Sequence, residues 1–300
     1  MLAAIAGTGL DLDALVAELV VDPATVSVML VGSLAEGLGT TASDVDLLVL
    51  ADSPADRRAG VTEMEHGGGA TVEFRRFDHG IEVNPELAFR SEMRPIVGAF
   101  LELAPLLYQP DASVRFPRLT GHQIRLLHRL RTGVIWSGPD RVAMWRDELY
   151  TQLLAPYLTL LYVSDLDHNY EQAFALREGG GAASSPYALA VAGRCVGESA
   201  LLAGLASVGI TNPSVAAAVD LSVGVDDPDV RPLLDLALHS MFPVMEMNAD
   251  AGLAYLAQLA ALRDAVDARI ASMGLDRTRA ALATLAPIVL PPSAGRAPTF

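Results

Sequence analysis

Short apolar runs separated by polar turns fill the first third of the chain, a pattern typical of strands. Residues 28–31 form one such run, which ends at Gly32-Ser33, and residues 45–50 form the next. Runs of this length bounded by turn residues predict buried strands. Further strands are predicted in the same way over residues 61–66, 70–77 and 80–86. An amphipathic helix is predicted before them, at residues 10–21. This part of the chain therefore predicts a helix-flanked mixed sheet of about five strands.

From residue 87 onward the sequence indicates helical segments, and at residues 253–270 the apolar positions recur at spacings of three and four, which is typical of a helix. Helices are predicted over residues 88–108, 120–132, 139–163, 185–207, 230–243 and 249–273, with an irregular link at 208–229. The predicted fold class is therefore α+β. We expect a sheet domain at residues 1–87, an all-helical domain at 88–290 and a flexible tail at 291–300.

The net charge of the chain bears on which classes of molecule it can bind. The 300-residue chain has a formal net charge of −15 and contains no lysine, so every permanently charged basic side chain is an arginine. A long nucleic-acid partner is disfavoured, because phosphate contacts need clustered basic side chains. The acidic charge is compatible with a small cationic partner, and plain solubility is the other interpretation of that charge.

Three further features of the sequence indicate where in the cell the protein is located. Cys195 is the single cysteine, which excludes an internal disulfide. The N-terminal segment lacks the basic stretch of a signal peptide. The longest apolar run, residues 153–163, is too short to cross a bilayer. We therefore expect a cytoplasmic protein with no membrane partner.

Asp44 and Asp46 stand at the start of the second predicted strand. Residues two apart in a strand share a face, so both carboxylates point the same way. Buried side by side they repel each other unless a cation lies between them. Mg²⁺ is typically held by one or two carboxylates together with substrate phosphates. Upstream, Gly32 lets the backbone approach closely, Ser33 offers a hydroxyl, and a following helical turn suits phosphate. The stretch therefore predicts a site for a metal-bound triphosphate.

Gly32-Ser33, a spacer of ten residues and Asp44-Val45-Asp46 together resemble the signature of the DNA polymerase β-like nucleotidyltransferase superfamily. The resemblance covers about residues 26–86 and includes the aminoglycoside-nucleotidyltransferase-like members. It implies that Gly32 and Ser33 hold the β and γ phosphates of a nucleotide. It also implies that Asp44 and Asp46 hold one or two Mg²⁺ ions.

The resemblance further implies a third carboxylate on a later strand. Glu73 and Glu82 both fit, because each is flanked by apolar residues in a predicted strand. Glu82 is preferred because its strand leads into the helical region, and Glu73 is the alternative. If the turn between the two strands is centred on Phe77-Asp78, Glu73 and Glu82 are direct cross-strand neighbours. A longer turn shifts that register.

Arg194 falls in a predicted helix of small and apolar residues, where a cation needs a partner. Glu198, one turn later, is the ordinary partner. The resemblance instead places Arg194 at the triphosphate, across an interdomain cleft, where relatives often use lysine. It also makes Glu198 a lesser candidate for the general base.

The predicted helix at residues 120–132 is the basic one of the chain. It carries His122, Arg125, His128, Arg129 and Arg131. The favoured interpretation is a solvated face or an internal acid partner, and a contact with nucleotide or acceptor is the alternative.

By the resemblance, the chain transfers a nucleoside monophosphate from an NTP, with ATP expected, to a hydroxyl of a small molecule such as an antibiotic or metabolite. Pyrophosphate leaves, and one or two Mg²⁺ ions are the expected cofactors. The catalytic and metal-binding residues are then Asp44, Asp46 and Glu82, and the nucleotide-binding residues are Gly32, Ser33 and Arg194. A homodimer is a further expectation. Two other classes stay open: a toxin-like transferase acting on tRNA or protein, and a non-catalytic nucleotide-binding regulator.

Overall fold

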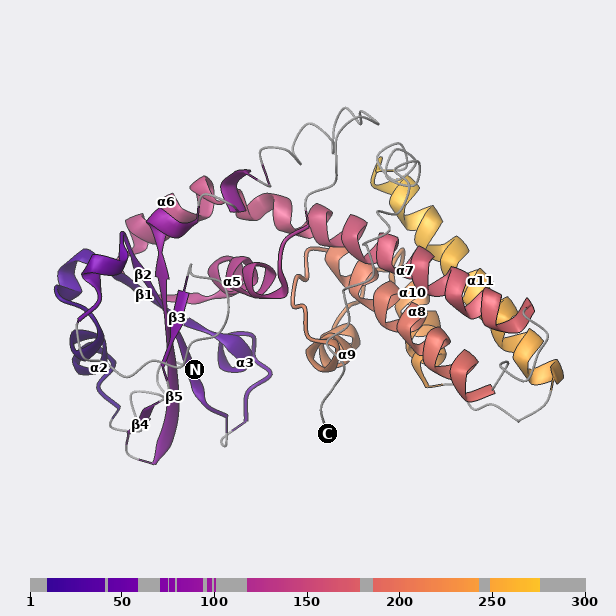
Figure 1. The fold of residues 1–300 in the computed structure, drawn as a ribbon, viewed down its shortest axis with the longest axis horizontal. Coiled ribbons are helices and arrows are strands. Elements are labelled where there is room, and N and C mark those ends of the chain that lie inside the picture. The colour runs from indigo at the N-terminus through magenta and orange to yellow at the C-terminus, as the bar shows by residue number, and fades with distance from the viewer. Residues whose placement is uncertain are drawn as a thin grey trace, which may run out of the picture.

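The computed structural model describes residues 10–40, 43–58, 71–74, 76–78, 80–93, 96–98, 100, 118–178, 186–242 and 249–275. The strand predicted at residues 61–66 and the tail predicted at 291–300 lie outside these residues. Figure 1 shows an elongated arrangement in which a half built around a sheet lies beside a half built of helices.

One sheet organises the first half. Its strands are β1 (Ser27–Val31), β2 (Val45–Ala51), β3 (Thr71–Glu73), β4 (Arg76–Asp78), β5 (Ile81–Phe89) and β6 (Val134–Ser137). Their order is β3-β5-β2-β1-β6, and β4 pairs with the start of β5. The β2–β5 pair is parallel and the other pairs are antiparallel. The sheet is therefore mixed, as the sequence predicted.

The α-helices follow in chain order. They are α2 (Leu12–Leu19), α3 (Gly32–Ala35), α5 (Gly121–Thr132), α6 (Pro139–Glu148), α7 (Leu154–Glu178), α8 (Pro186–Ser207), α9 (Val215–Val223), α10 (Arg231–Met241) and α11 (Ala249–Ser272). Short 3₁₀ turns occur at Pro23–Thr25, Pro54–Asp56, Arg90–Glu92 and Thr151–Leu153.

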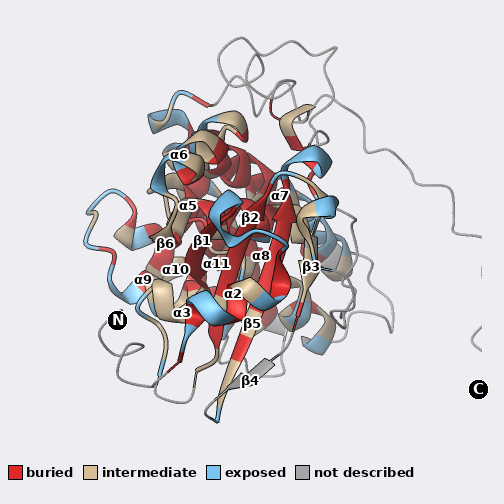
Figure 2. Cartoon of the chain, turned by 90° about the vertical axis from the view of Figure 1, so that its left-hand side faces the viewer, coloured by how far each residue is buried: buried red, intermediate tan, exposed pale blue. Residues whose placement is uncertain are grey.

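Successive side chains of a strand point to opposite faces of the sheet. Both faces are apolar here, and different helices pack against each of them. On one face, residues such as Leu30 and Leu47 pack in a cluster with Leu15 and Leu19 of α2. On the other, Met29 and Leu48 join a larger cluster that contains residues of α5, α6 and the helical half. Figure 2 shows the buried residues running through β1, β2 and β5 and on into the helices. The second face is the one on which the polar residues of the site also lie.

Local sequence fixes where α5 begins. The Thr120 hydroxyl accepts a hydrogen bond from the backbone N–H of Gln123, and the Gln123 side chain accepts one from the N–H of Thr120. This capping box satisfies two N–H groups that the first turn leaves unpaired. It starts the helix just before His122, with its apolar side toward the sheet.

The prediction of an α+β fold is confirmed, but β6 and α9 were not predicted. The single helix predicted at 139–163 is two helices, α6 and α7, the second of which continues to Glu178. β6 is a four-residue strand whose residues are all half-buried, so it shows no alternation that sequence could reveal. It pairs with β1 although it lies beyond residue 87, so the sheet draws on both sides of that proposed domain boundary. The boundary itself stays a prediction. α9 lies in the range expected to be irregular, where Ser214 caps it by accepting from the N–H of Ala217.

Within the described residues, one helix is long and apolar enough, by length and composition alone, to cross a membrane. It is the stretch Tyr187–Ser207 of α8, of whose most apolar window 67% is buried against the rest of the protein. Such burial is typical of the central helix of a helical bundle, and α8 packs against α7, α10 and α11.

Candidate active site

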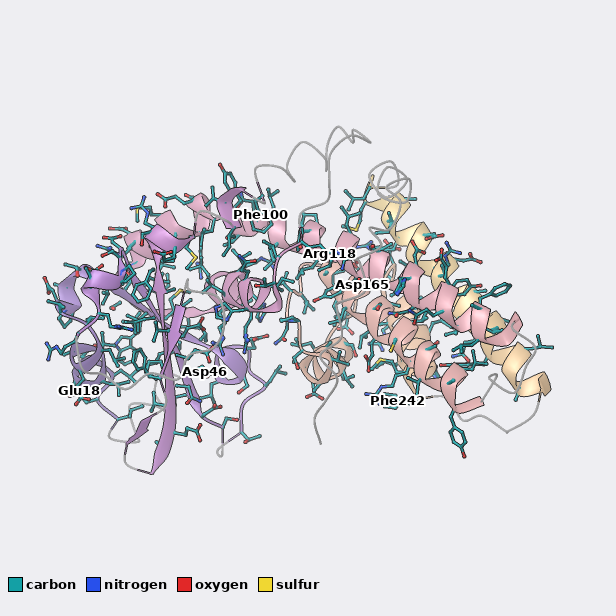
Figure 3. The ribbon with its side chains drawn as sticks, viewed as in Figure 1. Glu18, Asp46, Phe100, Arg118, Asp165 and Phe242 are labelled. Carbon is teal, nitrogen blue, oxygen red and sulfur yellow. The ribbon has the colours of Figure 1, made fainter. Side chains whose placement is uncertain are left out.

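Parallel pairing of β2 with β5 brings the polar starts of both strands together. Asp46 is the register partner of Asn84, and Val45 is that of Val83. The Asn84 side-chain amide donates a hydrogen bond to Asp44 Oδ2 at 2.6 Å. Figure 3 shows Asp46 on the side of the sheet near α3. The predicted aspartate pair therefore lies where β2 begins, next to the polar residues near the start of β5.

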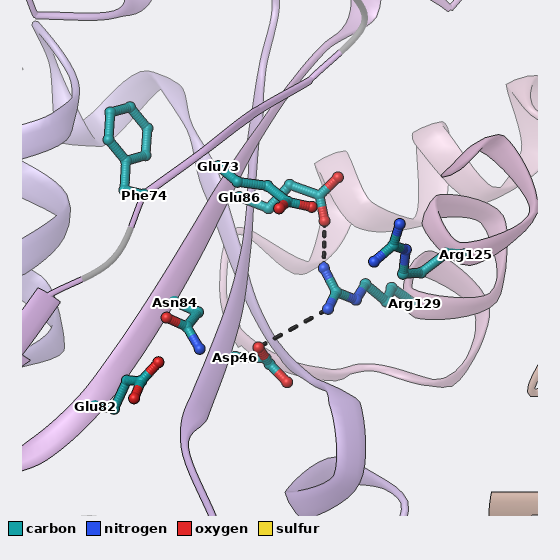
Figure 4. Close-up of a pocket in the computed structure, with 8 residues that line it drawn as sticks. All are labelled: Asp46, Glu73, Phe74, Glu82, Asn84, Glu86, Arg125 and Arg129. Carbon is teal, nitrogen blue, oxygen red and sulfur yellow. Dashed lines mark hydrogen bonds and ion pairs between the residues drawn. The ribbon is translucent and has the colours of Figure 1, made fainter. Parts of the chain in front are cut away.

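A cavity of about 340 Å³ opens over these residues. It is lined by Asp46, Glu73, Phe74, Glu82, Asn84, Glu86, Arg125 and Arg129 (Figure 4). Four carboxylates and two guanidinium groups thus surround one space. Such a lining suits a ligand that carries both anionic and cationic groups, or an anion together with a metal ion.

Gly32 lies directly against Asp46. Its φ of +71° belongs to the left-handed region that glycine favours, and a Cβ at this position would overlap Asp46 Oδ2. The end of β1 and the start of β2 can approach this closely only because residue 32 has no side chain. The sequence paired these two positions through their motif, and the structure brings them together.

Arg129 of α5 lies between two carboxylates. Its guanidinium donates a short hydrogen bond to Glu86 Oε2, and its Nη2 is 3.8 Å from Asp46 Oδ1. Burial alone would lower the pKa of Arg129, but the charges of Glu86 and Asp46 outweigh it and raise that pKa. Arg129 is therefore a permanent cation inside the site.

Asp46 is not fully compensated by Arg129. Burial raises its pKa to about 6, Arg129 acts in the opposite direction, and the nearby charges of Asp44 and Glu86 raise it further. In the absence of a ligand the fold therefore disfavours the ionised form of this carboxyl group. An additional cation would relieve that unfavourable charge.

Both candidates for the third carboxylate line the cavity, but they are not neighbours. Glu73 pairs in register with Glu86, and Glu82 pairs with Phe77. The turn centred on Phe77-Asp78 is therefore wrong, because Asp78 already pairs with Ile81. Glu86 was missed by sequence reasoning. Its signal was its spacing of four from Glu82, which puts both on one face of β5.

Sequence reasoning favoured a solvated face or an internal acid partner for the basic residues of α5. Two of them, Arg125 and Arg129, line the cavity, and Arg129 has the internal acid partner Glu86. Arg125 is exposed and has no ion-pair partner among the described residues. Arg194, by contrast, does not line this cavity; its Nε donates to Glu198 Oε1 at 2.8 Å, and its side chain is 57% exposed. The ordinary pairing considered for Arg194 is therefore the one that the structure contains.

A buried network ties the segment after Gly32-Ser33 to the helical half. His128 Nε2 is 2.9 Å from Glu36 Oε1, and the Asn212 amide donates to Glu36 Oε2 at 2.9 Å. His128 Nδ1 is 2.9 Å from the Thr211 hydroxyl. Burial alone would raise the pKa of Glu36, but the hydrogen bonds and charge of His128, with Asn212, hold it below its ordinary value. Glu36 thus fixes α3 between α5 and the 209–214 segment.

Replacing His128 with leucine is expected to destabilise the protein by about 1–3 kcal/mol, because Glu36 and Thr211 each lose a buried partner. The free energy of unfolding in urea measures this. His168→Ala is the matched control, since His168 is exposed and hydrogen-bonded only within α7 among the described residues. Equal effects of the two changes would show that the network contributes nothing to stability.

Comparison with known proteins bears on this site. The family model of the nucleotidyltransferase domain matches residues 14–102. Residues 14–102 form a nucleotidyltransferase domain of the DNA polymerase β-like superfamily. This domain contains the Gly32-Ser33 turn, both aspartates and all three glutamates of the cavity. The two arginines come from α5, outside the matched range.

The chain was also compared with solved structures and with curated proteins. The chain is similar to a nucleotidyltransferase-like protein of solved structure from Exiguobacterium sibiricum 255-15, at 14% identity and a TM-score of 0.44. The similarity covers 85% of this chain and 73% of that one. No curated protein matches the sequence.

Proposed function

We propose that this nucleotidyltransferase uses Mg²⁺ and an NTP, with ATP as the first candidate, to transfer a nucleoside monophosphate to a hydroxyl of a small acceptor. The acceptor oxygen bonds to the α-phosphorus, the bond to the bridging oxygen of the β-phosphate breaks, and pyrophosphate leaves. The acceptor hydroxyl gives up its proton to solvent water. The observation that carries the proposal is the placement of Asp46 against Gly32, within a matched nucleotidyltransferase domain and on an open cavity.

The donor types at this place suit magnesium, although Asp44, Asp46 and Glu82 are not a group whose ligand atoms lie within 4.8 Å of one another in the described structure. Asp44, Asp46 and Glu82 offer hard oxygen ligands, and the raised pKa of Asp46 marks a carboxylate that lacks sufficient positive charge nearby. Bound there, Mg²⁺ would stabilise charge on the attacking and leaving oxygens. Asn84, by donating to Asp44 Oδ2, fixes that carboxylate beside the start of β5.

Phosphate binding is proposed for Gly32, Ser33 and Arg125. Arg125 faces the same cavity as Asp46 and is not neutralised by an ion pair among the described residues. A guanidinium can donate two parallel hydrogen bonds to a phosphate. Arg125 therefore takes the role that the sequence gave to Arg194.

The acceptor is proposed to be small and cationic. The carboxylates of the cavity and the net charge of −15 favour a positively charged group over a polyanion such as tRNA. A cytoplasmic location and a homodimer remain parts of the proposal.

Pyrophosphate release tests the proposal. The purified protein is incubated with Mg²⁺, each common NTP and a panel of aminoglycosides, other amino alcohols, nucleosides and RNA. Release is expected with a cationic small molecule and is expected to vanish in Asp44→Ala/Asp46→Ala. Failure of Mg²⁺ and NTP to bind at all would contradict the proposed function.

Arg125→Ala is expected to raise the KM for the NTP about tenfold, equivalent to about 1.4 kcal/mol of lost binding. The free energy of unfolding should not change, because Arg125 is exposed. Arg194→Ala is the matched control, an exposed arginine on another helix. A larger KM effect from Arg194→Ala would return the phosphate role to Arg194.

A further inference from the structure

We propose that Glu73, Glu86 and His122 form a binding site for a transition-metal dication, separate from the site of Asp44 and Asp46. The three side chains come from β3, β5 and the first turn of α5. One ligand atom from each lies within 4.8 Å of the others. Among the described residues, no other group of three His, Cys, Asp or Glu side chains meets this condition.

An unsatisfied buried oxygen points to a missing ligand. Glu86 is 1% exposed, and its Oε1 has no hydrogen-bond partner among the described residues. His122 Nε2 is 3.7 Å from that oxygen, which is beyond hydrogen-bonding distance. Buried carboxylate oxygens are normally hydrogen-bonded or bound to a metal, because leaving them without a partner is costly.

The local charge also calls for a cation. Glu73 and Glu86 are direct cross-strand partners, and like charges in that position destabilise a sheet. Arg129 neutralises one of them through Glu86 Oε2, but it is shared with Asp46. A dication between Glu73 and Glu86 would compensate the negative charge that Arg129 does not neutralise.

The ligand set selects the kind of metal. Imidazole with carboxylates suits Zn²⁺ and its first-row neighbours, whereas Mg²⁺ prefers oxygen ligands throughout. Figure 4 shows Arg129 lying between Asp46 and the Glu73–Glu86 pair, with interactions to Asp46 and Glu86. The two groups of carboxylates are therefore held apart by a fixed positive charge, and they can take different cations.

Metal binding would join α5 to two strands. Because His122 lies one turn before Arg125 and two turns before Arg129, a bound ion would fix the helix that places both arginines in the cavity. The expected role of the site is structural. It does not depend on the transfer reaction proposed above.

Zinc binding to the full-length protein tests this inference. The protein is stripped of metal with a chelator, and Zn²⁺ alone is then titrated by calorimetry, without nucleotide. Cobalt absorption in the visible range reports the coordination geometry of the bound metal, and thermal unfolding reports stabilisation by a ligand that binds the folded state. The variants are His122→Ala, Glu73→Gln, Asp44→Asn/Asp46→Asn and, as the matched control, His168→Ala.

We expect one equivalent of Zn²⁺ to bind and to raise the unfolding temperature of the wild type, the aspartate double variant and His168→Ala. Both His122→Ala and Glu73→Gln should weaken binding at least about tenfold. Glu73 is only half-buried, so Glu73→Gln should fold even if His122→Ala does not. Absence of zinc uptake, uptake unaffected by Glu73→Gln, or uptake lost in the aspartate double variant would each overturn the inference.

Discussion

Replacing Arg129 with methionine is expected to destabilise the protein by about 3–5 kcal/mol, measured as the free energy of unfolding in urea with a chelator present. The side chain of Glu86 is 2% exposed and that of Arg129 is 16% exposed, so this ion pair is shielded from water. Without the guanidinium, Glu86 keeps a buried charge beside Asp46 and Glu73. The loss comes from that uncompensated charge rather than from the intrinsic strength of the pair.

Arg141→Met provides the matched control for this measurement. Arg141 Nη1 is 2.8 Å from Asp52 Oδ2, but the Asp52 side chain is 52% exposed. Exposed ion pairs contribute about 0–1 kcal/mol, so this variant should be close to wild type. Equal losses in the two variants would contradict the view that Arg129 is the internal counter-charge of the site.

Replacing Asp46 with asparagine is expected to stabilise the metal-free protein by up to about 3 kcal/mol above pH 6. A rise in the pKa of Asp46 from its ordinary value of 3.8 to about 6 means that the fold prefers the protonated form. At about 1.36 kcal/mol per pKa unit, ionisation in the folded state carries that cost. Asparagine does not ionise and avoids it.

The stability difference between Asp46→Asn and the wild type should depend on pH. The cost of ionised Asp46 is absent below about pH 4 and complete above about pH 6. It grows between these values, because there the native state binds more protons than the unfolded state. The advantage of Asp46→Asn should therefore shrink to nothing on acidification. Asp264→Asn, an exposed position on α11, should lie within about 0.5 kcal/mol of wild type at every pH. A variant less stable than wild type at pH 7 would contradict the prediction.

If the proposed function holds, the wild type should be more stable than Asp46→Asn when Mg²⁺ and NTP are present. The wild type gains stability because the ligand binds only the folded state, whereas Asp46→Asn binds it poorly. Residues that act on a ligand commonly lower the stability of the protein that carries them.

The sequence predicted the parts of the site that follow from local periodicity. The strand period of two predicted that Asp44 and Asp46 share a face; in the structure Asp46 lies in β2 and lines the cavity, and Asp44 directly precedes that strand. Gly32 directly follows β1, as the sequence predicted. These statements need only neighbouring residues. Glu82 as a cavity residue is of the same kind, since it was identified from the apolar residues on either side of it in a predicted strand.

The sequence could not predict what the tertiary structure adds. Arg125 and Arg129 belong to a helix whose polar side gives no indication of which surface it meets, and solvent is the usual answer. Only the packing of α5 against the sheet turns that side toward the carboxylates. Glu86 gains its importance in the same way, because its partner lies 43 positions away along the chain. Arg194 shows the reverse case, where a helical spacing of four correctly identified the partner.

Strand β6 has a consequence for how the protein can be synthesised and divided. It is hydrogen-bonded to β1, one of the first strands made, yet it follows the end of the matched domain by more than thirty residues. A nascent chain or an expressed fragment that ends near residue 102 would present the unpaired edge of β1, and such edges recruit other chains. The matched domain is therefore a unit of homology but not of folding. Its sheet is complete only after the ribosome has translated α5 and β6 as well.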